Sequence, residues 1–201
     1  MFPNPKDKKI SSQPNQCAFT LIEMVIAVAI FSIAIVIISG IFLSTIKAQR
    51  KASAILEAQA EARYALEVMT RKIREGYIDY DYSGYSGGIT SPEVELALKD
   101  LDGNPIIFFQ DTTCDDADSS PCIKMSLGGN TQLLTGKGLK VNNLKFYISP
   151  LEDPFIPDFD PSTGNQPRVT IVMTIQSVGT RPEQIATVFL QTTASSRYYQ
   201  R

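Results

Sequence analysis

The fold class that the sequence predicts is α+β, with one long N-terminal helix followed by an antiparallel β-sheet. The helix is indicated by an apolar run that leads directly into residues 47–75, which contain neither proline nor glycine. The sheet is indicated by apolar residues that alternate with polar ones after residue 88, with Gly or Pro between the alternating stretches. A chain of 201 residues with 43 % hydrophobic content leaves room for one modest globular domain beyond the helix.

The apolar run spans residues 18–46 and contains one charged residue, Glu23. From Met24 to Ile46 there is no charge, and as a helix this stretch is long enough to cross a hydrocarbon core of about 30 Å. A cleaved secretory signal has a shorter apolar region and a small-residue site behind it, and a lipoprotein signal would place its cysteine after the run, whereas Cys17 precedes it. We therefore predict a single-pass membrane anchor.

The residues before the run predict its orientation. Lysines in the polar leader favour an N-terminus that stays in the cytoplasm and a C-terminal domain that is exported, although a second basic cluster follows the run. A plain signal anchor would explain the run but neither the leader nor Glu23, because a carboxylate within an apolar span is costly. A Glu so close to the helix start could instead reach the lipid headgroups.

Beyond the anchor the helix is predicted to continue as an amphipathic segment. Small and apolar residues recur there at spacings of three and four, which is the period of one helix face; they are Ala58, Ala62, Ala65, Leu66, Met69 and Ile73. Gly76 is expected to end the helix in the usual manner of a C-terminal glycine. Ser39-Gly40 is either the site of a bend or a tolerated helix glycine.

The β part is predicted to consist of hairpins with one buried face, which the helix covers. Asp102-Gly103 and Gly128-Gly129 supply the tight turns of two hairpins. The stretches that we predict as strands are residues 93–98, 105–109, 122–127, 131–134, 144–148, 169–175 and 185–193.

Composition argues against two classes of function. The net charge is −2, and removal of residues 1–18, which hold three Lys and one Asp, would make it −4, so the basic footprint of a nucleic-acid-binding protein is missing. The chain has no His, which removes Ser-His-Asp and Cys-His nucleophile systems and the commonest metal ligand. We therefore expect neither an enzyme nor a cofactor.

Three local features could carry chemistry. Cys114 and Cys122 are eight residues apart, which in an exported domain indicates a disulfide, with free thiols as the alternative. The tyrosine-rich segment 77–88 could be a recognition surface, or its rings could simply cover the sheet edge. Acidic residues could offer oxygen ligands to calcium, although neither group has the spacing of a calcium loop and solvated carboxylates are the usual interpretation; they are Asp111, Asp115, Asp116 and Asp118, and Glu152, Asp153, Asp158 and Asp160.

The start of the apolar run resembles a known family. Phe19-Thr20-Leu21-Ile22-Glu23, behind a short basic leader, is similar to the N-terminus of type IV pilins and of the pseudopilins of type II secretion. The resemblance implies that a prepilin peptidase cuts between Ala18 and Phe19 and methylates the new amino group of Phe19. It also implies that the Glu23 carboxylate compensates the N-terminal amine of a neighbouring subunit. Ala18 departs from the family's usual Gly, so cleavage could be slower.

The resemblance also implies an organisation and a set of partners. Residues 1–18 would be a cytoplasmic leader, 19–46 the transmembrane helix, 47–76 the amphipathic half of the spine helix, and 77–201 the exported β domain. Partners would be the prepilin peptidase, other pilins or pseudopilins through the N-terminal helix, and the inner-membrane assembly platform. Residues 62–66 and 190–197 resemble, more weakly, the minor J-type or W-type members. The chain would thus be a filament subunit; alternatives are a subunit of a DNA-uptake or adhesion filament and a signal-anchored binding module that never polymerises.

Overall fold

The structure is a computed structural model that describes residues 19–85, 87–112, 114, 120–136, 138–155 and 166–197. The chain divides into two units, Met1–Thr45 and Ile46–Arg201. Among the described residues, the first unit contains Phe19, Thr20 and the start of the N-terminal helix, and the second contains the end of this helix and the strands.

Helix α1 covers Leu21–Glu75, a length of 55 residues, which confirms the prediction of one long N-terminal helix. The helix continues without a break through Ser39-Gly40. Within the second unit, the residues predicted to form the apolar face are the ones that are buried. Several of them are alanines, and their small side chains let the strands approach the helix closely.

Helix α1 ends just before Gly76, as expected, but Gly76 does not act as the predicted C-terminal cap. The helix ends at Glu75 and the Gly76 N–H still donates to the Lys72 carbonyl at 2.9 Å. Gly76 does not adopt the left-handed conformation of a C-terminal glycine cap, however, because its φ lies outside the positive range. A Cβ at Gly76 would lie 2.4 Å from the Lys99 carbonyl oxygen, so the glycine is required by the close approach of another backbone segment.

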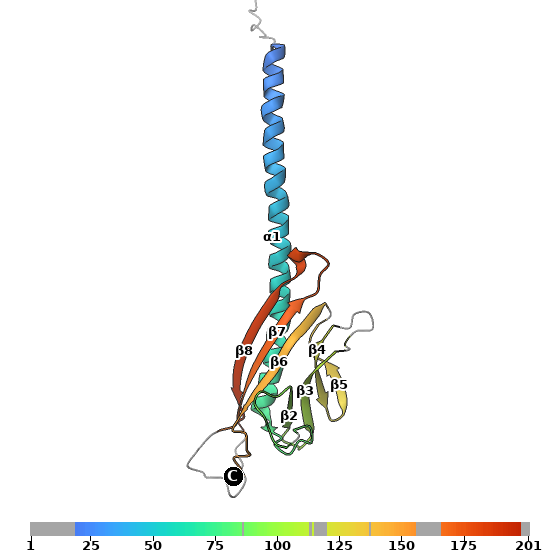
Figure 1. The fold of residues 1–201 in the computed structure, drawn as a ribbon, viewed down its shortest axis with the longest axis vertical. Helices are drawn as coiled ribbons and strands as arrows, with labels where there is room; N and C mark the ends of the chain where they lie inside the picture. Colours follow the sequence, from blue (N-terminus) through green and yellow to red (C-terminus); the bar gives the residue numbers. More distant parts are fainter. Residues whose placement is uncertain are drawn as a thin grey trace, which may run out of the picture. The chain divides into compact units, whose positions relative to one another are not determined.

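The strands form two antiparallel sheets, with the orders β1-β2-β3-β4-β5 and β6-β7-β8 (Figure 1). The elements are β1 (Tyr77–Ile78), β2 (Glu95–Lys99), β3 (Pro105–Asp111), β4 (Cys122–Leu127), β5 (Asn130–Leu133), β6 (Leu139–Ser149), β7 (Arg168–Ser177), the short 3-10 helix η2 (Pro182–Gln184) and β8 (Thr187–Ser195). An isolated bridge pairs Glu93, in the segment just before β2, with Phe146 of β6. The one sheet that the sequence indicated is therefore split in two.

The predicted hairpins are present with the expected turns. Gly103 has φ +84 between β2 and β3, and Gly128 and Gly129 have φ +56 and +91 between β4 and β5. Such positive values favour glycine, which explains the residue type at these turns. The stretch predicted from residue 93 begins as a strand only at Glu95, and β1, which has only two residues, is too short to leave a sequence pattern.

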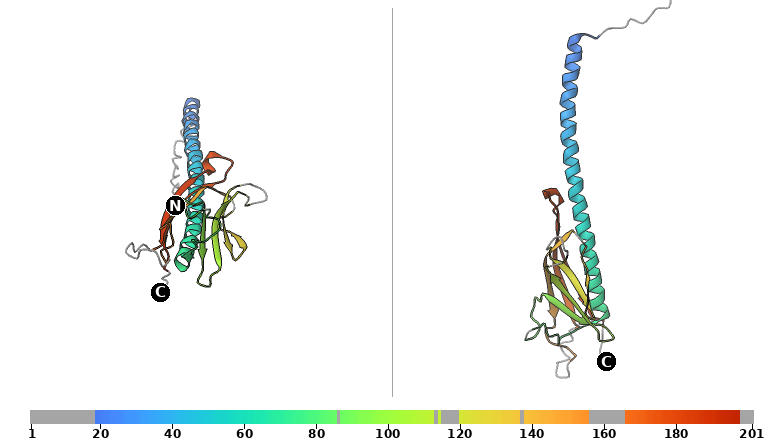
Figure 2. Two further views of the ribbon diagram at one scale, coloured as in Figure 1. Left: turned by 60° about the horizontal axis from the view of Figure 1, so that its bottom comes forward. Right: turned by 90° about the vertical axis from the view of Figure 1, so that its right-hand side faces the viewer.

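One hydrophobic core joins the second unit's part of α1 to both sheets. Met69 and Ile73 of α1 are fully buried in the same cluster as Phe108 of β3 and Phe146 of β6. The right-hand view in Figure 2 shows the sheets along one side of this part of the helix. The arrangement confirms the α+β fold class, with a pilin-like layout of helix and antiparallel sheet.

Candidate functional site

The candidate site is the start of α1, where a local hydrogen bond fixes the first turn. The Glu23 N–H donates to the Thr20 hydroxyl at 3.3 Å, and the Met24 N–H donates to the Thr20 carbonyl at 3.3 Å. Thr20 is therefore the N-cap, and Thr20-Leu21-Ile22-Glu23 has the T-x-x-E spacing of a capping box. Sequence reasoning missed this capping role of Thr20, although the spacing signals it.

Phe19 and Glu23 lie on either side of the Thr20 cap and have different surroundings. Phe19 precedes the first helical residue and is 74 % exposed. Glu23 lies in the first turn of α1, where the positive end of the helix dipole favours a negative charge. Among the described residues, no cation forms an ion pair with Glu23, so any such partner must come from elsewhere.

The rest of the first unit presents an apolar surface. One described helix, α1, is long and apolar enough to cross a membrane by length and composition, and its most apolar window is not buried in the protein. Hydroxyl groups in this stretch bond back to the helix: Ser32, Ser39 and Thr45 each donate to a carbonyl four residues earlier, at 2.7 to 2.9 Å. Such bonds satisfy polar groups where no water is present. Glu23 is therefore the one charged group in an otherwise lipid-compatible segment.

Comparison with known proteins bears on this same segment. Residues 13–39 match the family model described as the prokaryotic N-terminal methylation motif. The chain carries a prepilin-type methylation motif. No curated protein and no solved structure matches the chain significantly.

The methylation motif supports a type IV pilin-like protein that a prepilin peptidase processes, and it points to a structural subunit. The match includes Thr20 and Glu23 and extends over both sides of the expected cleavage point. Ala18 and the leader, with Cys17, lie outside the described residues. Neither the J-type nor the W-type assignment is addressed by the motif, because the segments behind those resemblances lie beyond residue 39.

The cysteine pair lies at the rim of the five-stranded sheet. Cys114 and Cys122 form a disulfide with a Cα–Cα distance of 5.9 Å. Cys122 is the first residue of β4 and is paired with Asp111 at the end of β3, so the bridge closes the connection between two neighbouring strands. Beside it, the Lys124 ammonium lies 2.6 Å from the Asp111 carboxylate.

The acidic groups considered for calcium fall only partly within the structure. Asp115, Asp116, Asp118, Asp158 and Asp160 lie outside the described residues. Within the described part of the chain, no group of three or more His, Cys, Asp or Glu residues could hold a metal ion. The Asp153 carboxylate accepts a hydrogen bond from the Phe155 N–H at 2.9 Å, which is a local turn contact.

The tyrosine-rich segment is turned into the protein. The Tyr85 ring is only 7 % exposed, and its hydroxyl accepts the Ala97 N–H at 2.8 Å. The hydroxyls of Tyr80 and Tyr82 donate to the Pro150 carbonyl at 3.2 Å and to the Glu95 carboxylate at 3.0 Å. Burial raises the pKa of Tyr85 to about 12. These contacts favour a structural role over a recognition surface.

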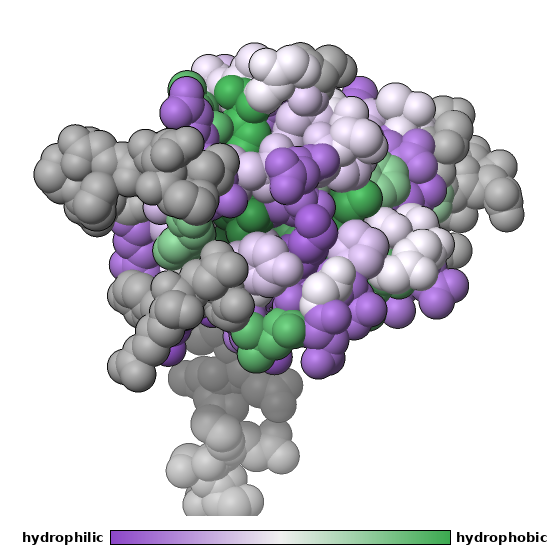
Figure 3. Space-filling view, turned by 90° about the horizontal axis from the view of Figure 1, so that it is seen from below, coloured by the Kyte–Doolittle hydropathy of each residue, from purple (hydrophilic) through white to green (hydrophobic). Residues whose placement is uncertain are grey.

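The end of the second unit seen from below offers little apolar surface. On that face hydrophilic and intermediate residues predominate, and apolar residues appear in separate patches among the coloured residues (Figure 3). A continuous apolar docking face is therefore not present among the residues coloured in that view.

Proposed function

We propose that this protein is a prepilin-like structural subunit, a minor pilin or pseudopilin, that assembles into a type IV pilus or a type II secretion pseudopilus. The observation that carries the proposal is the methylation motif at the start of a helix of 55 residues. In this proposal the apolar half of α1 is held by lipid before assembly and by the helices of neighbouring subunits afterwards. The C-terminal domain is exported, and the N-terminus is cytoplasmic until assembly.

Glu23 has a defined task in this proposal. Its carboxylate lies in the first helical turn without a cation partner among the described residues. The free amine that cleavage creates at Phe19 of a neighbouring subunit supplies the missing positive charge. In a low-dielectric core this attraction is strong, so it sets the stagger between subunits.

The experiment compares Glu23→Gln with a matched control, Glu57→Gln, on the same helix beyond the apolar run. The full-length variants are expressed in a host with the assembly machinery, and the fraction of each in sheared filaments is compared with the fraction in membranes. We expect Glu23→Gln to lower the filament fraction by at least about tenfold, because an uncompensated amine is left in the core. Glu57→Gln should behave as wild type.

Two outcomes would contradict the proposal. One is a wild-type chain that never leaves the membrane fraction in cells that make filaments, which would favour an anchored binding module. The other is normal incorporation of Glu23→Gln, which would remove the role assigned to the carboxylate.

A further inference from the structure

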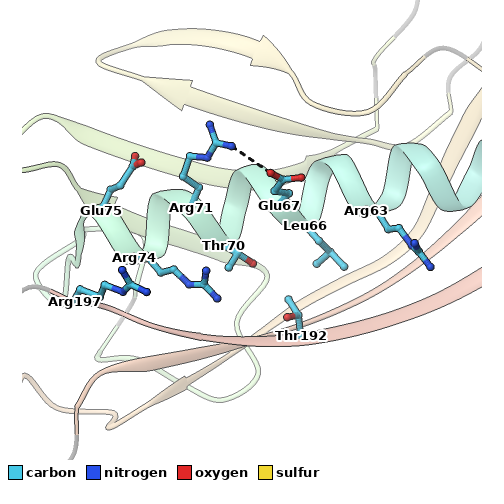
Figure 4. Close-up of a pocket in the computed structure, with 9 residues that line it drawn as sticks. All are labelled: Arg63, Leu66, Glu67, Thr70, Arg71, Arg74, Glu75, Thr192 and Arg197. Carbon is cyan, nitrogen blue, oxygen red and sulfur yellow. Dashed lines mark hydrogen bonds and ion pairs between the residues drawn. The ribbon is translucent and has the colours of Figure 1, made fainter.

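A groove of about 460 Å³ runs between the last turns of α1 and strand β8 in the second unit. Its walls are formed by residues of α1, of β8 and of the segment after β8; they are Arg63, Leu66, Glu67, Thr70, Arg71, Arg74 and Glu75, with Thr192 and Arg197. Figure 4 shows Leu66, Thr70 and Arg74 directed from the helix towards β8, and Thr192 directed back. The part of the groove that faces β8 therefore has arginines at its ends and an apolar and hydroxyl-bearing centre. The lining carboxylates of Glu67 and Glu75 point away from β8 in Figure 4.

The helix period explains why these residues share one side. Each lies next to a buried residue: Arg63 follows Ala62, Thr70 follows Met69, and Arg74 follows Ile73. A step of one residue turns about 100° around the helix, so the groove lies on the flank of the buried face.

Two of the arginines come together from distant parts of the sequence. Arg197 follows Ser196, whose hydroxyl donates to the Gly76 carbonyl at 2.7 Å. This contact holds the segment after β8 against the end of α1, and Figure 4 shows Arg197 beside Arg74. Two neighbouring guanidinium groups repel each other unless an anion lies between them, so the pair is a ready anion site.

Three of the four arginines that line the groove form no ion pair with a described residue. The exception is Arg71, which pairs with Glu67 at 3.2 Å, and both side chains point away from β8 in Figure 4. The other lining carboxylate, Glu75, lies 3.7 Å from the Lys72 ammonium. No described carboxylate forms an ion pair with Arg63, Arg74 or Arg197. This positive groove is unusual in a chain with a net charge of −2.

We infer that the groove binds an extended, acidic peptide segment of a neighbouring filament subunit, an inference that rests on the proposed function. Arg63 and Arg74 are separated by roughly 16 Å along the helix axis, the span of about five residues of extended chain. Beside them β8 is an edge strand: it pairs with β7, and no described strand occupies its other edge. Carboxylates at both ends of such a segment would meet the arginines, while its backbone lies along β8.

The charge of the groove favours a peptide over nucleic acid. The three arginines without an ion pair could neutralise few phosphates, and the acidic chain around them would repel a long polyanion. A small anion would engage Arg74 and Arg197 but leave Arg63 unused. A peptide with a few spaced carboxylates satisfies all three cations and also contacts Leu66 and Thr192.

The test uses the full-length chain in its own membrane, with a photo-reactive phenylalanine analogue placed at Thr192 or, as a control site, at Lys140 of β6. We expect light to join the Thr192 site to a chain that itself carries a methylation motif, at a segment containing Asp or Glu. Reversal of both charges, Arg74→Glu with Arg197→Glu, should lower the yield at least about tenfold. Lys140→Glu should leave it unchanged, and Arg74→Lys with Arg197→Lys should retain part of it.

Several results would overturn the inference: a product with nucleic acid or lipid, no product at all, or an undiminished yield after the double reversal. Unchanged resistance of the C-terminal domain to limited proteolysis in each variant shows that a lost product does not reflect a misfolded domain. The wild-type filament fraction is measured in parallel. Normal incorporation without the cross-link contradicts the inference about the groove but not the proposed function. Absence of the wild-type chain from filaments contradicts the proposed function.

Discussion

Thr20 and Glu23 stabilise the start of α1, independently of any role in assembly. The Thr20 hydroxyl caps the first turn, and the Glu23 charge lies at the positive end of the helix dipole. The same two residues belong to the segment that matches the methylation motif. The cap uses the backbone N–H of Glu23, and the Glu23 side chain forms no ion pair with a described residue. The carboxylate that stabilises the helix start is therefore also available to the amine of a neighbouring subunit.

The titration of Tyr85 reports on the packing of the second unit. Burial is the main cause that raises its pKa from 10.0 to about 12, and the nearby Glu93 and Asp79 carboxylates add to it. A raised pKa in the folded state means that the folded state holds the proton more tightly. The contribution of the protonated Tyr85 hydroxyl to the free energy of unfolding is therefore complete below about pH 10. It is lost as the pH rises towards about 12.

We predict that Tyr85→Phe makes the free energy of unfolding less dependent on pH in this alkaline range. The wild-type chain should lose about 2 to 3 kcal/mol from this group between about pH 10 and 12. The variant should lack that loss but be about 1 to 3 kcal/mol less stable at neutral pH, because the Ala97 N–H loses its buried acceptor. Denaturant unfolding of the detergent-solubilised chain, followed by tyrosine circular dichroism, measures both. Equal alkaline slopes for the two proteins would contradict the assignment.

At the scale of elements, the end of α1 is a junction of three segments. Gly76 approaches the Lys99 carbonyl of β2 closely, and its own carbonyl accepts the Ser196 hydroxyl. The glycine thus allows the helix end, the first sheet and the segment after β8 to meet. The same junction holds Arg197 beside Arg74.

We predict that Gly76→Ala destabilises the second unit by about 1 to 3 kcal/mol, because the added methyl group collides with backbone that cannot move as a flexible side chain would. Gly40→Ala is the matched control, since a Cβ there meets no atom within 4 Å. Thermal unfolding of the β signal in the full-length variants distinguishes them. A melting temperature for Gly76→Ala that equals that of Gly40→Ala would refute the close-approach explanation.

The elements differ in how far the sequence predicts them. The buried stripe of α1 and the Gly103 and Gly128-Gly129 hairpins are local patterns, and they could be predicted from spacing and turn residues alone. The split into two sheets could not, because it depends on which strands pair across long separations, as at the Glu93–Phe146 bridge. The sequence also could not predict why residue 76 is a glycine, because Lys99, whose backbone approaches it closely, belongs to another element.

At the scale of the whole chain, the site was predictable only in its linear part. Phe19 to Glu23 is a contiguous motif, so the order of its residues alone is enough to recognise it. The arginine groove combines one helix flank with the segment after β8, and nothing in the sequence near Arg74 indicates Arg197. Surfaces assembled from distant segments are visible only once the chain is folded.

N-terminal mass analysis after co-expression with a cognate prepilin peptidase decides whether this chain is a processed prepilin, on which the roles of Phe19 and Glu23 both depend. A catalytically inactive peptidase is the control, and Ala18→Gly, which restores the family's usual residue, should be cut at least as fast as wild type. We predict a mature chain that begins at Phe19 and carries one methyl group on its amine. A chain that still begins at Met1 in the presence of active peptidase would contradict this prediction.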